Sequence, residues 1–280
     1  MRSHLSHNSR RTPKITYVSP YDPWAKRVLM ALIERICGGK KIDKLYTEIR
    51  HTEMEPEQIW EKSIKKLELQ LRYNEEKLLA APKEGPLVFI SNHPFGVVDG
   101  LILGYFASRI RKDFVVIVNE VLLGQDERID SFLLPIDFRD TKSAMKANIQ
   151  TKNETLNRLA NGEALVIFPS GGVATSPKGF GKAEDLEWKR FVAKVIQQSK
   201  ATVIPIFVHG QNSRLFQLVS QVSATLRLGM LLHEVRNKIG KPIYLEIGDP
   251  IPYEEMAHIR DRQKLLDHLW KVTHDLGKSA

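Results

Sequence analysis

Short apolar runs alternate along this chain with longer segments in which apolar residues recur at helical spacing. The apolar runs are rich in Val, Ile, Leu and Phe, and each ends abruptly in small or polar residues, as buried strands do where they open into loops. The predicted strands cover residues 87–90, 114–118, 164–168, 202–208 and 242–247. Residues 133–140 form a further short apolar segment that ends in charge.

The segments between these runs predict helices, because their apolar side chains repeat every three to four positions. The predicted helices cover residues 24–37, 56–66, 101–110, 143–160, 185–199, 215–238 and 254–275. Residues 67–73 alternate between apolar and polar side chains, which predicts another strand. The alternative there is a helix with Trp60, Ile64, Leu67 and Leu71 on one face.

Strands that alternate with helices are typical of an α/β fold with a mainly parallel central sheet flanked by helices. We expect this domain to occupy residues 56–280. Residues 1–55 are predicted to form a basic N-terminal extension that is disordered over residues 1–12 and then contains an amphipathic helix. Asp22-Pro23 is a typical helix start, and Gly38-Gly39 is a typical end.

Charge is concentrated near the N-terminus. The chain carries a formal charge of +9, and residues 1–50 alone hold eleven Lys or Arg against four Asp or Glu. Such a segment can bind nucleic acid or an anionic membrane surface. No basic helix with base-reading spacing is present, so nucleic acid is not an expected partner. The basic helix with Trp24 suits a bilayer interface, and packing on the core is the alternative.

Other features of composition bear on where in the cell the protein is expected. No apolar run approaches the roughly 20 residues that cross a bilayer, so no transmembrane span is predicted. The polar, basic first residues lack the apolar segment of a secretory signal. A single cysteine, Cys37, excludes an intrachain disulfide and a multi-cysteine metal site. We therefore expect a cytoplasmic protein.

The polar residues after the first buried strand suggest chemistry. Asn92 and His93 follow the strand, and Asp99 falls in the first turn of the next helix. A carboxylate there can fix the tautomer of the imidazole, which makes His93 and Asp99 a candidate general-base dyad. The alternative is a structural hydrogen bond. A metal site is not expected, because no third ligand lies at close spacing.

Other polar residues also lie just beyond predicted strand ends, where ligands bind in parallel sheets. Arg139, Ser170 and Asn212 are in this position, as is His93. We therefore expect them to converge on one cleft.

Four ordered blocks resemble those of the glycerolipid (lysophospholipid) acyltransferases. They are residues 92–100, 138–139, 168–172 and 203–206. Residues 21–24 and 209–216 look like the bacterial hemolysin-type or ornithine-lipid-type branch. The resemblance covers residues 60–250 and implies an acyltransferase domain over 56–280.

The resemblance assigns roles to individual residues. It implies that His93 is the general base and Asp99 its orienting carboxylate. Arg139 takes the place of a basic residue that faces the acceptor head group, with an ion pair to Asp137 or Asp140 as the alternative. Gly171 matches the third block and Pro205 the fourth. A larger group is predicted to bind substrate: Asn92, Arg139, Ser170, Gly171 and Gly172.

The blocks also depart from the family pattern. Five residues separate His93 from Asp99 where four are usual, and Gly96 is best able to absorb the extra one. In the third block Ser170, Gly172 and Val173 replace Glu, Thr and Arg. A cation expected near the acceptor phosphate is missing, which argues against lysophosphatidic acid and makes a lyso-ornithine lipid a candidate.

The resemblance thus implies an O-acyltransferase that moves a fatty acyl group from acyl carrier protein or coenzyme A to the hydroxyl of a lysolipid. The thioester is a co-substrate, and no cofactor is expected. The basic leader would hold the enzyme peripherally on the cytoplasmic face of the inner or plasma membrane. A thioesterase or lipid hydrolase with the same dyad, and a non-catalytic lipid-binding protein, are the alternatives.

Overall fold

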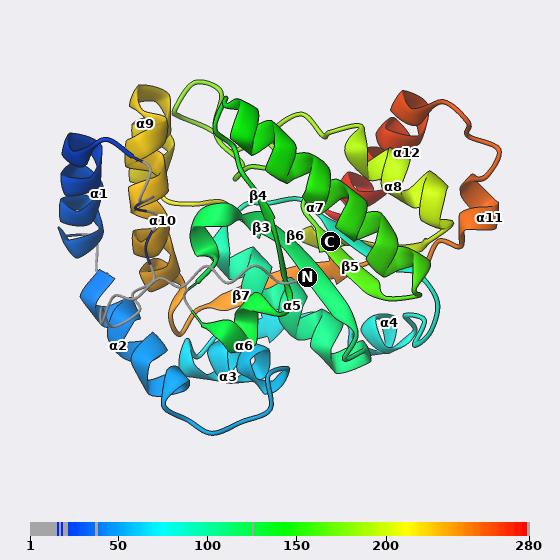
Figure 1. The fold of residues 1–280 in the computed structure, drawn as a ribbon, viewed down its shortest axis with the longest axis horizontal. Coiled ribbons are helices and arrows are strands. Elements are labelled where there is room, and N and C mark those ends of the chain that lie inside the picture. Colours follow the sequence, from blue (N-terminus) through cyan, green and yellow to red (C-terminus); the bar gives the residue numbers. More distant parts are fainter. Residues whose placement is uncertain (1–15, 17, 19–21, 37–38, 125, 279–280) are drawn as a thin grey trace.

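The computed structural model describes residues 16, 18, 22–36, 39–124 and 126–278. The predicted disorder of residues 1–12 lies outside them. Within the described residues, a seven-stranded sheet with the order β1-β7-β6-β2-β5-β3-β4 forms the centre of the molecule (Figure 1). The strands are β1 (Gln70–Arg72), β2 (Leu87–Ser91), β3 (Phe114–Asn119), β4 (Leu133–Ile136), β5 (Ala164–Ile167), β6 (Thr202–Val208) and β7 (Pro242–Ile247).

The sheet is mainly parallel, as predicted. Among the strand pairs of the described residues, only β6 and β7 run antiparallel. β2 lies between β5 and β6, with Leu87 opposite Ala164 on one side and Thr202 on the other. The carboxyl ends of β2, β4, β5 and β6 therefore meet at one edge of the sheet, and the loops that follow them share that edge.

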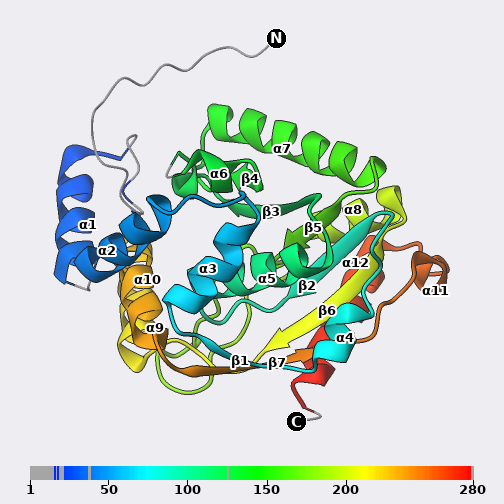
Figure 2. The same cartoon turned by 90° about the horizontal axis from the view of Figure 1, so that it is seen from below.

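Helices cover both faces of the sheet (Figure 2). Side chains alternate along each strand, so Leu87 and Phe89 join a core with α2, α3, α5 and α10, whereas Val88 and Ile90 join a core with α7, α8 and α12. The helices are α1 (Trp24–Ile36), α2 (Gly39–Arg50), α3 (Gln58–Lys66), α4 (Glu75–Leu79), α5 (Val97–Ile110), α6 (Glu127–Asp130), α7 (Lys142–Ala160), α8 (Phe191–Ser199), α9 (Arg214–Val222), α10 (Ala224–Lys238), α11 (Tyr253–Met256) and α12 (Arg262–Leu276), with a short 3-10 helix η1 (Glu120–Leu122).

Several predicted boundaries were wrong for identifiable reasons. The helix predicted over 215–238 is two helices, because Ser223 is extended and its hydroxyl caps α10 by accepting the N–H of Leu226. The helix predicted over 254–275 is likewise divided into α11 and α12, and Asp261 caps the second. The strand predicted over 67–73 is limited to β1, since Leu67 still closes α3.

The N-terminal segment packs on the domain and also exposes an apolar surface. Ile42 and Ile49 of α2, a helix that the sequence pattern did not predict, are buried in the main core. On α1, Met30 is buried and Ile33 lies against Gly229 of α10. Its other face is open to solvent. The structure is therefore compatible with both alternatives for α1, which are packing on the core and contact with a bilayer interface. The predicted domain boundary at residue 55 stays a prediction.

Candidate active site

His93 and Asp99 lie in hydrogen-bond contact. His93 Nδ1 is 3.0 Å from Asp99 Oδ2, and Asp99 is fully buried while the His93 side chain is 15% exposed. Asp99 Oδ2 also accepts the backbone N–H groups of Phe95 at 2.7 Å and Gly96 at 2.9 Å. An ionised carboxylate can only accept, so Nδ1 carries the proton in this pair. The lone pair of His93 then lies on Nε2, which is the atom that can take a proton from a substrate.

Gly96 makes the five-residue spacing between His93 and Asp99 possible. Its φ of +79° is in the region that favours glycine, and it caps α5 immediately before the turn that contains Asp99. A Cβ on Gly96 would also lie 3.0 Å from Leu231 Cδ2 and 3.1 Å from Val173 Cγ2. The prediction that Gly96 absorbs the additional residue agrees with this backbone geometry.

The loop after β5 wraps around His93. The Phe168 ring stacks on the imidazole with centroids 4.0 Å apart, and the backbone N–H of Ala174 donates to the His93 carbonyl at 2.8 Å. Between these contacts Ser170 is buried, and its hydroxyl donates to the Gly172 carbonyl at 3.0 Å. The third block therefore forms one wall of the site, and the Ser170 hydroxyl shapes its turn.

The two glycines of this loop allow apolar side chains to approach. Gly171 has a φ of +67°, and a Cβ on it would lie 3.7 Å from the Phe138 ring. A Cβ on Gly172 would lie 2.8 Å from Leu186 Cδ1. The loop after β4, which holds Phe138 and Arg139, thus reaches the loop after β5, although β3 lies between the two strands. The loops after β4 and β5 thus contact each other, and the convergence of His93, Arg139, Ser170 and Asn212 on one cleft stays a prediction.

Asp185 also contacts the loop that holds His93, and the sequence did not single it out. Its Oδ1 accepts the backbone N–H of His93 at 3.1 Å, and its Oδ2 accepts the indole N–H of Trp188 at 2.8 Å. Burial raises the pKa of Asp185 and lowers the pKa of nearby His274. The sequence pattern placed Asp185 at a helix start, but α8 begins only at Phe191. No local signal reveals a partner 92 positions away.

Asn92 is held by backbone rather than presented to a substrate. Its Nδ2 donates to the Val208 carbonyl at 2.9 Å, and its Oδ1 accepts the Val208 N–H at 2.8 Å. These bonds fasten the end of β2 to the end of β6. The predicted substrate-binding role therefore has less geometric support than a structural one. Asn212, by contrast, is buried with no hydrogen-bond partner for its amide within the described part of the chain.

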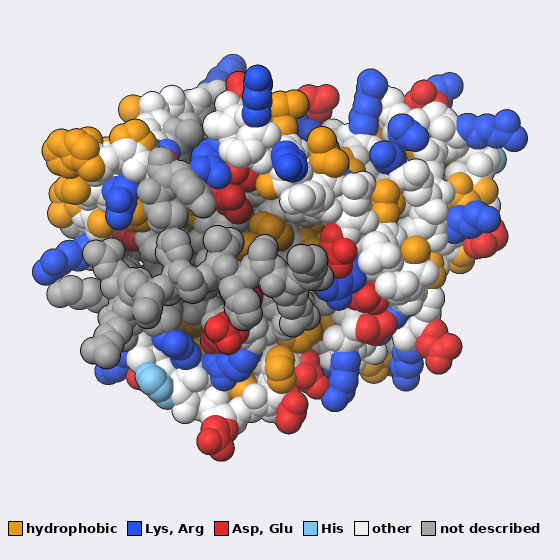
Figure 3. Space-filling model, in the orientation of Figure 1, with side chains coloured by type: hydrophobic (Ala, Val, Ile, Leu, Met, Phe, Trp, Pro, Cys, Tyr) orange, Lys and Arg blue, Asp and Glu red, His pale blue; other side chains and the backbone are white. Residues whose placement is uncertain are grey.

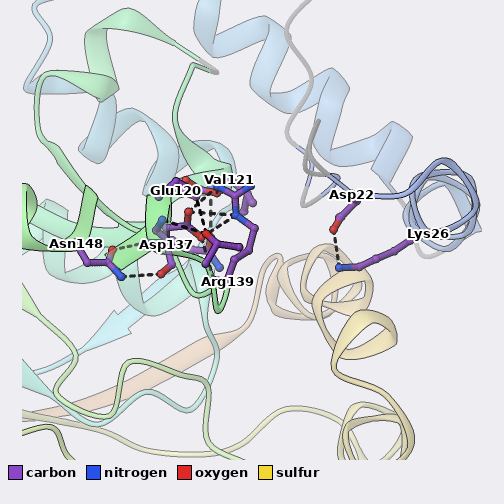
Figure 4. Close-up of polar contacts among 11 residues, drawn as sticks. Asp22, Lys26, Glu120, Val121, Asp137, Arg139 and Asn148 are labelled. Carbon is purple, nitrogen blue, oxygen red and sulfur yellow. Dashed lines mark hydrogen bonds and ion pairs between the residues drawn. The ribbon is translucent and has the colours of Figure 1, made fainter. Parts of the chain in front are cut away.

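Arg139 forms ion pairs with two carboxylates (Figure 4). Its guanidinium contacts Asp137 at 2.5 Å and Glu120 at 3.0 Å, and Asn148 fixes Asp137 through its backbone. The Arg139 hydrogen bonds lower the pKa of Asp137, whereas burial and then Asp137 raise the pKa of Glu120. The ion-pair alternative for Arg139 is thus present, with Glu120 as an additional partner.

Two surface hollows lie apart from the candidate dyad. A hollow of about 630 Å³ lies among α7, α8 and the start of α12, and another of about 640 Å³ lies beside Arg50 and Arg128. Neither is lined by His93 or Asp99.

Across the residues that the structure describes, no group of three or more His, Cys, Asp or Glu is placed to hold a metal ion. No described helix is both long and apolar enough to cross a membrane.

Comparison with known proteins assigns this chain to a family. The family model described as acyltransferase matches residues 41–279. A lyso-glycine lipid O-acyltransferase from Bacteroides thetaiotaomicron is 30% identical over 208 residues, which is 70% of this chain and 71% of that protein. A protein of the same name from Phocaeicola vulgatus is 28% identical over 186 residues, 62% of each chain.

A solved structure shows the same fold. The 1-acyl-sn-glycerophosphate acyltransferase from Thermotoga maritima aligns with a TM-score of 0.53, and the alignment covers 91% of this chain and 96% of that one. At 14% identity this likeness concerns the fold alone. The resemblance inferred from the four sequence blocks is confirmed by the family match. The chain belongs to the acyltransferase family and is an acyltransferase.

Proposed function

We propose that this enzyme transfers a fatty acyl group from a thioester to the hydroxyl of a lysolipid, with His93 as general base. The observation that carries the proposal is the His93 Nδ1 contact with buried Asp99, which leaves Nε2 as the proton acceptor. The names of the two curated relatives support a lysolipid acceptor. The chemistry needs no cofactor or metal.

The reaction begins when His93 Nε2 removes the proton of the acceptor hydroxyl as its oxygen attacks the thioester carbonyl. The tetrahedral intermediate then collapses, the C–S bond breaks, and the thiolate takes the proton back from Nε2. The products are an ester and a free thiol. Asp99 stabilises the transient imidazolium and keeps the ring oriented. General-base catalysis contributes about 10²–10⁴-fold, so positioning by the surrounding loops must supply the rest.

The acceptor we favour carries an amino acid in its head group, such as glycine or ornithine, in place of a bare phosphate. Val173 occupies the position where the family has a cation, and it is buried among Met30, Phe216 and Leu231. Arg139 already pairs with two carboxylates. The buried Val173, together with the names of the relatives, argues against lysophosphatidic acid as the preferred acceptor. Arg139 remains our candidate for contact with an acidic group on the head.

The donor is acyl carrier protein or coenzyme A, both of which are anionic. The hollow among α7, α8 and α12 supports an anionic donor, because it carries five cations and one acid. The cations are Lys152, Arg190, Lys194, Arg260 and Arg262. Arg190 is two residues from Trp188, whose indole N–H donates to Asp185. Asp185 in turn accepts the backbone N–H of His93, so this basic surface begins near the loop that holds His93.

Membrane association is supported by α1. Trp24, Val28, Leu29 and Leu32 are exposed on it, and Figure 3 shows apolar side chains gathered at that end of the molecule. Lys26, Arg27 and Arg35 accompany them, with Lys26 held by Asp22 at 2.7 Å (Figure 4). This pattern suits a helix at an anionic bilayer interface. We place the enzyme peripherally on the cytoplasmic face, where both candidate donors are available.

The test uses His93→Ala with His258→Ala, an exposed histidine, as the matched control. We expect His93→Ala to lose acyl transfer from acyl-carrier protein or acyl-coenzyme A to lyso-glycine and lyso-ornithine lipids while its circular dichroism is unchanged. His258→Ala should keep the wild-type rate. Retained transfer by a folded His93→Ala would refute the general-base role. Release of free fatty acid without an acceptor would favour the thioesterase alternative.

A further inference from the structure

A second apolar surface lies on α9 and the neighbouring loop over residues 176–183, which we call the α9 face. It consists of Phe180, Leu215, Leu218 and Val222. Phe180 is 71% exposed and Val222 is 79% exposed. Leu215, Leu218 and Val222 follow helical spacing, so they share one side of α9, whereas Phe216 and Gln217 are buried on the other. This arrangement makes α9 amphipathic, with its apolar side turned to solvent.

The charges beside the α9 face are mainly positive, although exposed Glu184 forms a backbone bridge with Thr175 at the end of the same loop. Residues 171–183 and 209–233 contain no Asp or Glu. Exposed cations flank the apolar side chains instead, namely Lys178, Lys182 and Arg214. An apolar surface bordered by cations complements an anionic lipid bilayer, in which the apolar groups enter the interface and the cations meet the head groups.

The helix that carries the α9 face lies at the same end of the molecule as α1. Both helices contact α10, and Figures 1 and 2 show all three at the same end of the molecule. A small buried core joins them, with Met30 from α1, Phe216 from α9 and Leu231 from α10. Two helices far apart in the sequence thus present apolar side chains from one rigid unit.

The same core contains Val173, which connects the α9 face to the dyad. The next residue, Ala174, donates its N–H to the His93 carbonyl. Ser176 is then tied to α9, since its N–H donates to Gln217 Oε1 at 2.7 Å and its carbonyl accepts from Gln221 Nε2 at 2.7 Å. Residues 173–176 therefore form a short segment that is hydrogen-bonded to the His93 carbonyl through Ala174 and to α9 through Ser176.

We propose that the α9 face enters the lipid bilayer as a second membrane contact, independent of α1, and brings the His93 loop to the interface where lysolipid resides. This inference rests on the proposed function, because it concerns access to a membrane-embedded acceptor. A bilayer accounts for the cationic border and for the exposed apolar side chains on both α1 and α9. A second copy of the chain would require an anionic complement, which this surface does not carry.

The test uses Phe180→Glu and Val222→Glu, separately and together. Both side chains project into solvent, so the fold should be preserved. Leu79→Glu is the matched control, because Leu79 is 47% exposed on α4, far from α9 in Figure 1. Vesicles contain phosphatidylglycerol and phosphatidylethanolamine. The double variant should partition onto them roughly tenfold more weakly than wild type or Leu79→Glu, since two apolar side chains that enter the bilayer in the proposal are replaced by charges.

Activity separates this inference from the proposed function. On vesicle-embedded lysolipid the double variant should transfer acyl groups more slowly, whereas on short-chain lysolipid dispersed as monomers it should match wild type. His93→Ala should fail on both substrates. Wild-type partitioning and vesicle activity in the double variant would overturn the inference. So would a wild-type dimer that Val222→Glu dissociates, since a second copy would then cover the face. If wild type transfers no acyl group to monomeric lysolipid, the proposed function fails instead.

Discussion

The backbone N–H of His93 donates to Asp185 Oδ1 at 3.1 Å, while the side chain of the same residue contacts Asp99. Two carboxylates from distant parts of the chain thus hold the candidate base, one at its backbone and one at its ring. Asp185 contacts the backbone of His93 and not its ring, so we expect it to position the base. Trp188 completes its hydrogen bonding from the other side.

Asp185→Asn should lower kcat about 10–100-fold with little change in KM, because an amide cannot accept both N–H groups with its single oxygen. Stability provides a second readout. Burial raises the Asp185 pKa, so the folded state binds this proton more tightly than the unfolded state. The stability of wild type relative to Asp185→Asn should therefore increase as pH falls from neutrality through the raised pKa towards 3.8.

Urea unfolding at several pH values, together with steady-state kinetics, measures both effects. Glu187→Gln is the control, because it removes an exposed carboxylate from the same loop. If the stability difference between wild type and Asp185→Asn does not change with pH, the buried-carboxylate explanation is wrong.

Asn92→Ala should reduce the free energy of unfolding, because it leaves the buried N–H and carbonyl of Val208 without partners. The expected cost is roughly 1–3 kcal/mol for each unsatisfied group. Asn153→Ala, on the exposed side of α7, should have little effect. Denaturant titration measures the loss. A large increase in acceptor KM with unchanged stability would instead support the predicted substrate-binding role.

Gly104→Ala and Gly100→Ala should have opposite effects, although both lie on α5. A Cβ on Gly104 would lie 2.2 Å from the Trp60 ring, whereas a Cβ on Gly100 meets nothing within 4 Å. We expect Gly104→Ala to destabilise the protein by about 1–3 kcal/mol through overpacking. Gly100→Ala should stabilise it by up to about 1 kcal/mol through helix propensity. Thermal unfolding compares the two, and equal midpoints would contradict this packing of α3 on α5.

Arg139→Gln tests the head-group contact. If Arg139 binds an acidic group, acceptor KM should increase about tenfold or more with kcat nearly unchanged, as expected for loss of a charge-assisted hydrogen bond. Arg109→Gln breaks a comparable ion pair with Glu75 and serves as the control. Kinetics with lyso-ornithine lipid, lyso-glycine lipid and lysophosphatidic acid identify the head group. An unchanged KM for every acceptor would leave Arg139 a structural ion-pair residue.

The site illustrates why some residues could be predicted and others could not. His93 and Asp99 are six positions apart, so a strand end, a glycine turn and a helix start bring them together through local geometry. Asn92 and Val208 are 116 positions apart, and only the parallel pairing of β2 with β6 makes them partners. The sequence pattern therefore located Asn92 at the site. It could not reveal that the backbone N–H and carbonyl of Val208 are the hydrogen-bond partners of its amide.

By itself, the sequence determined the α/β class, the mainly parallel sheet and the position of the His-Asp pair, because hydrophobic periodicity and turn residues act between near neighbours. Tertiary structure decided that α8 begins at Phe191, that Asp185 is directed to His93, and that α9 turns its apolar side outwards. These outcomes depend on contacts between segments far apart in the chain. The physical reason is that periodicity identifies an apolar side of a helix, whereas only packing decides whether that side is covered.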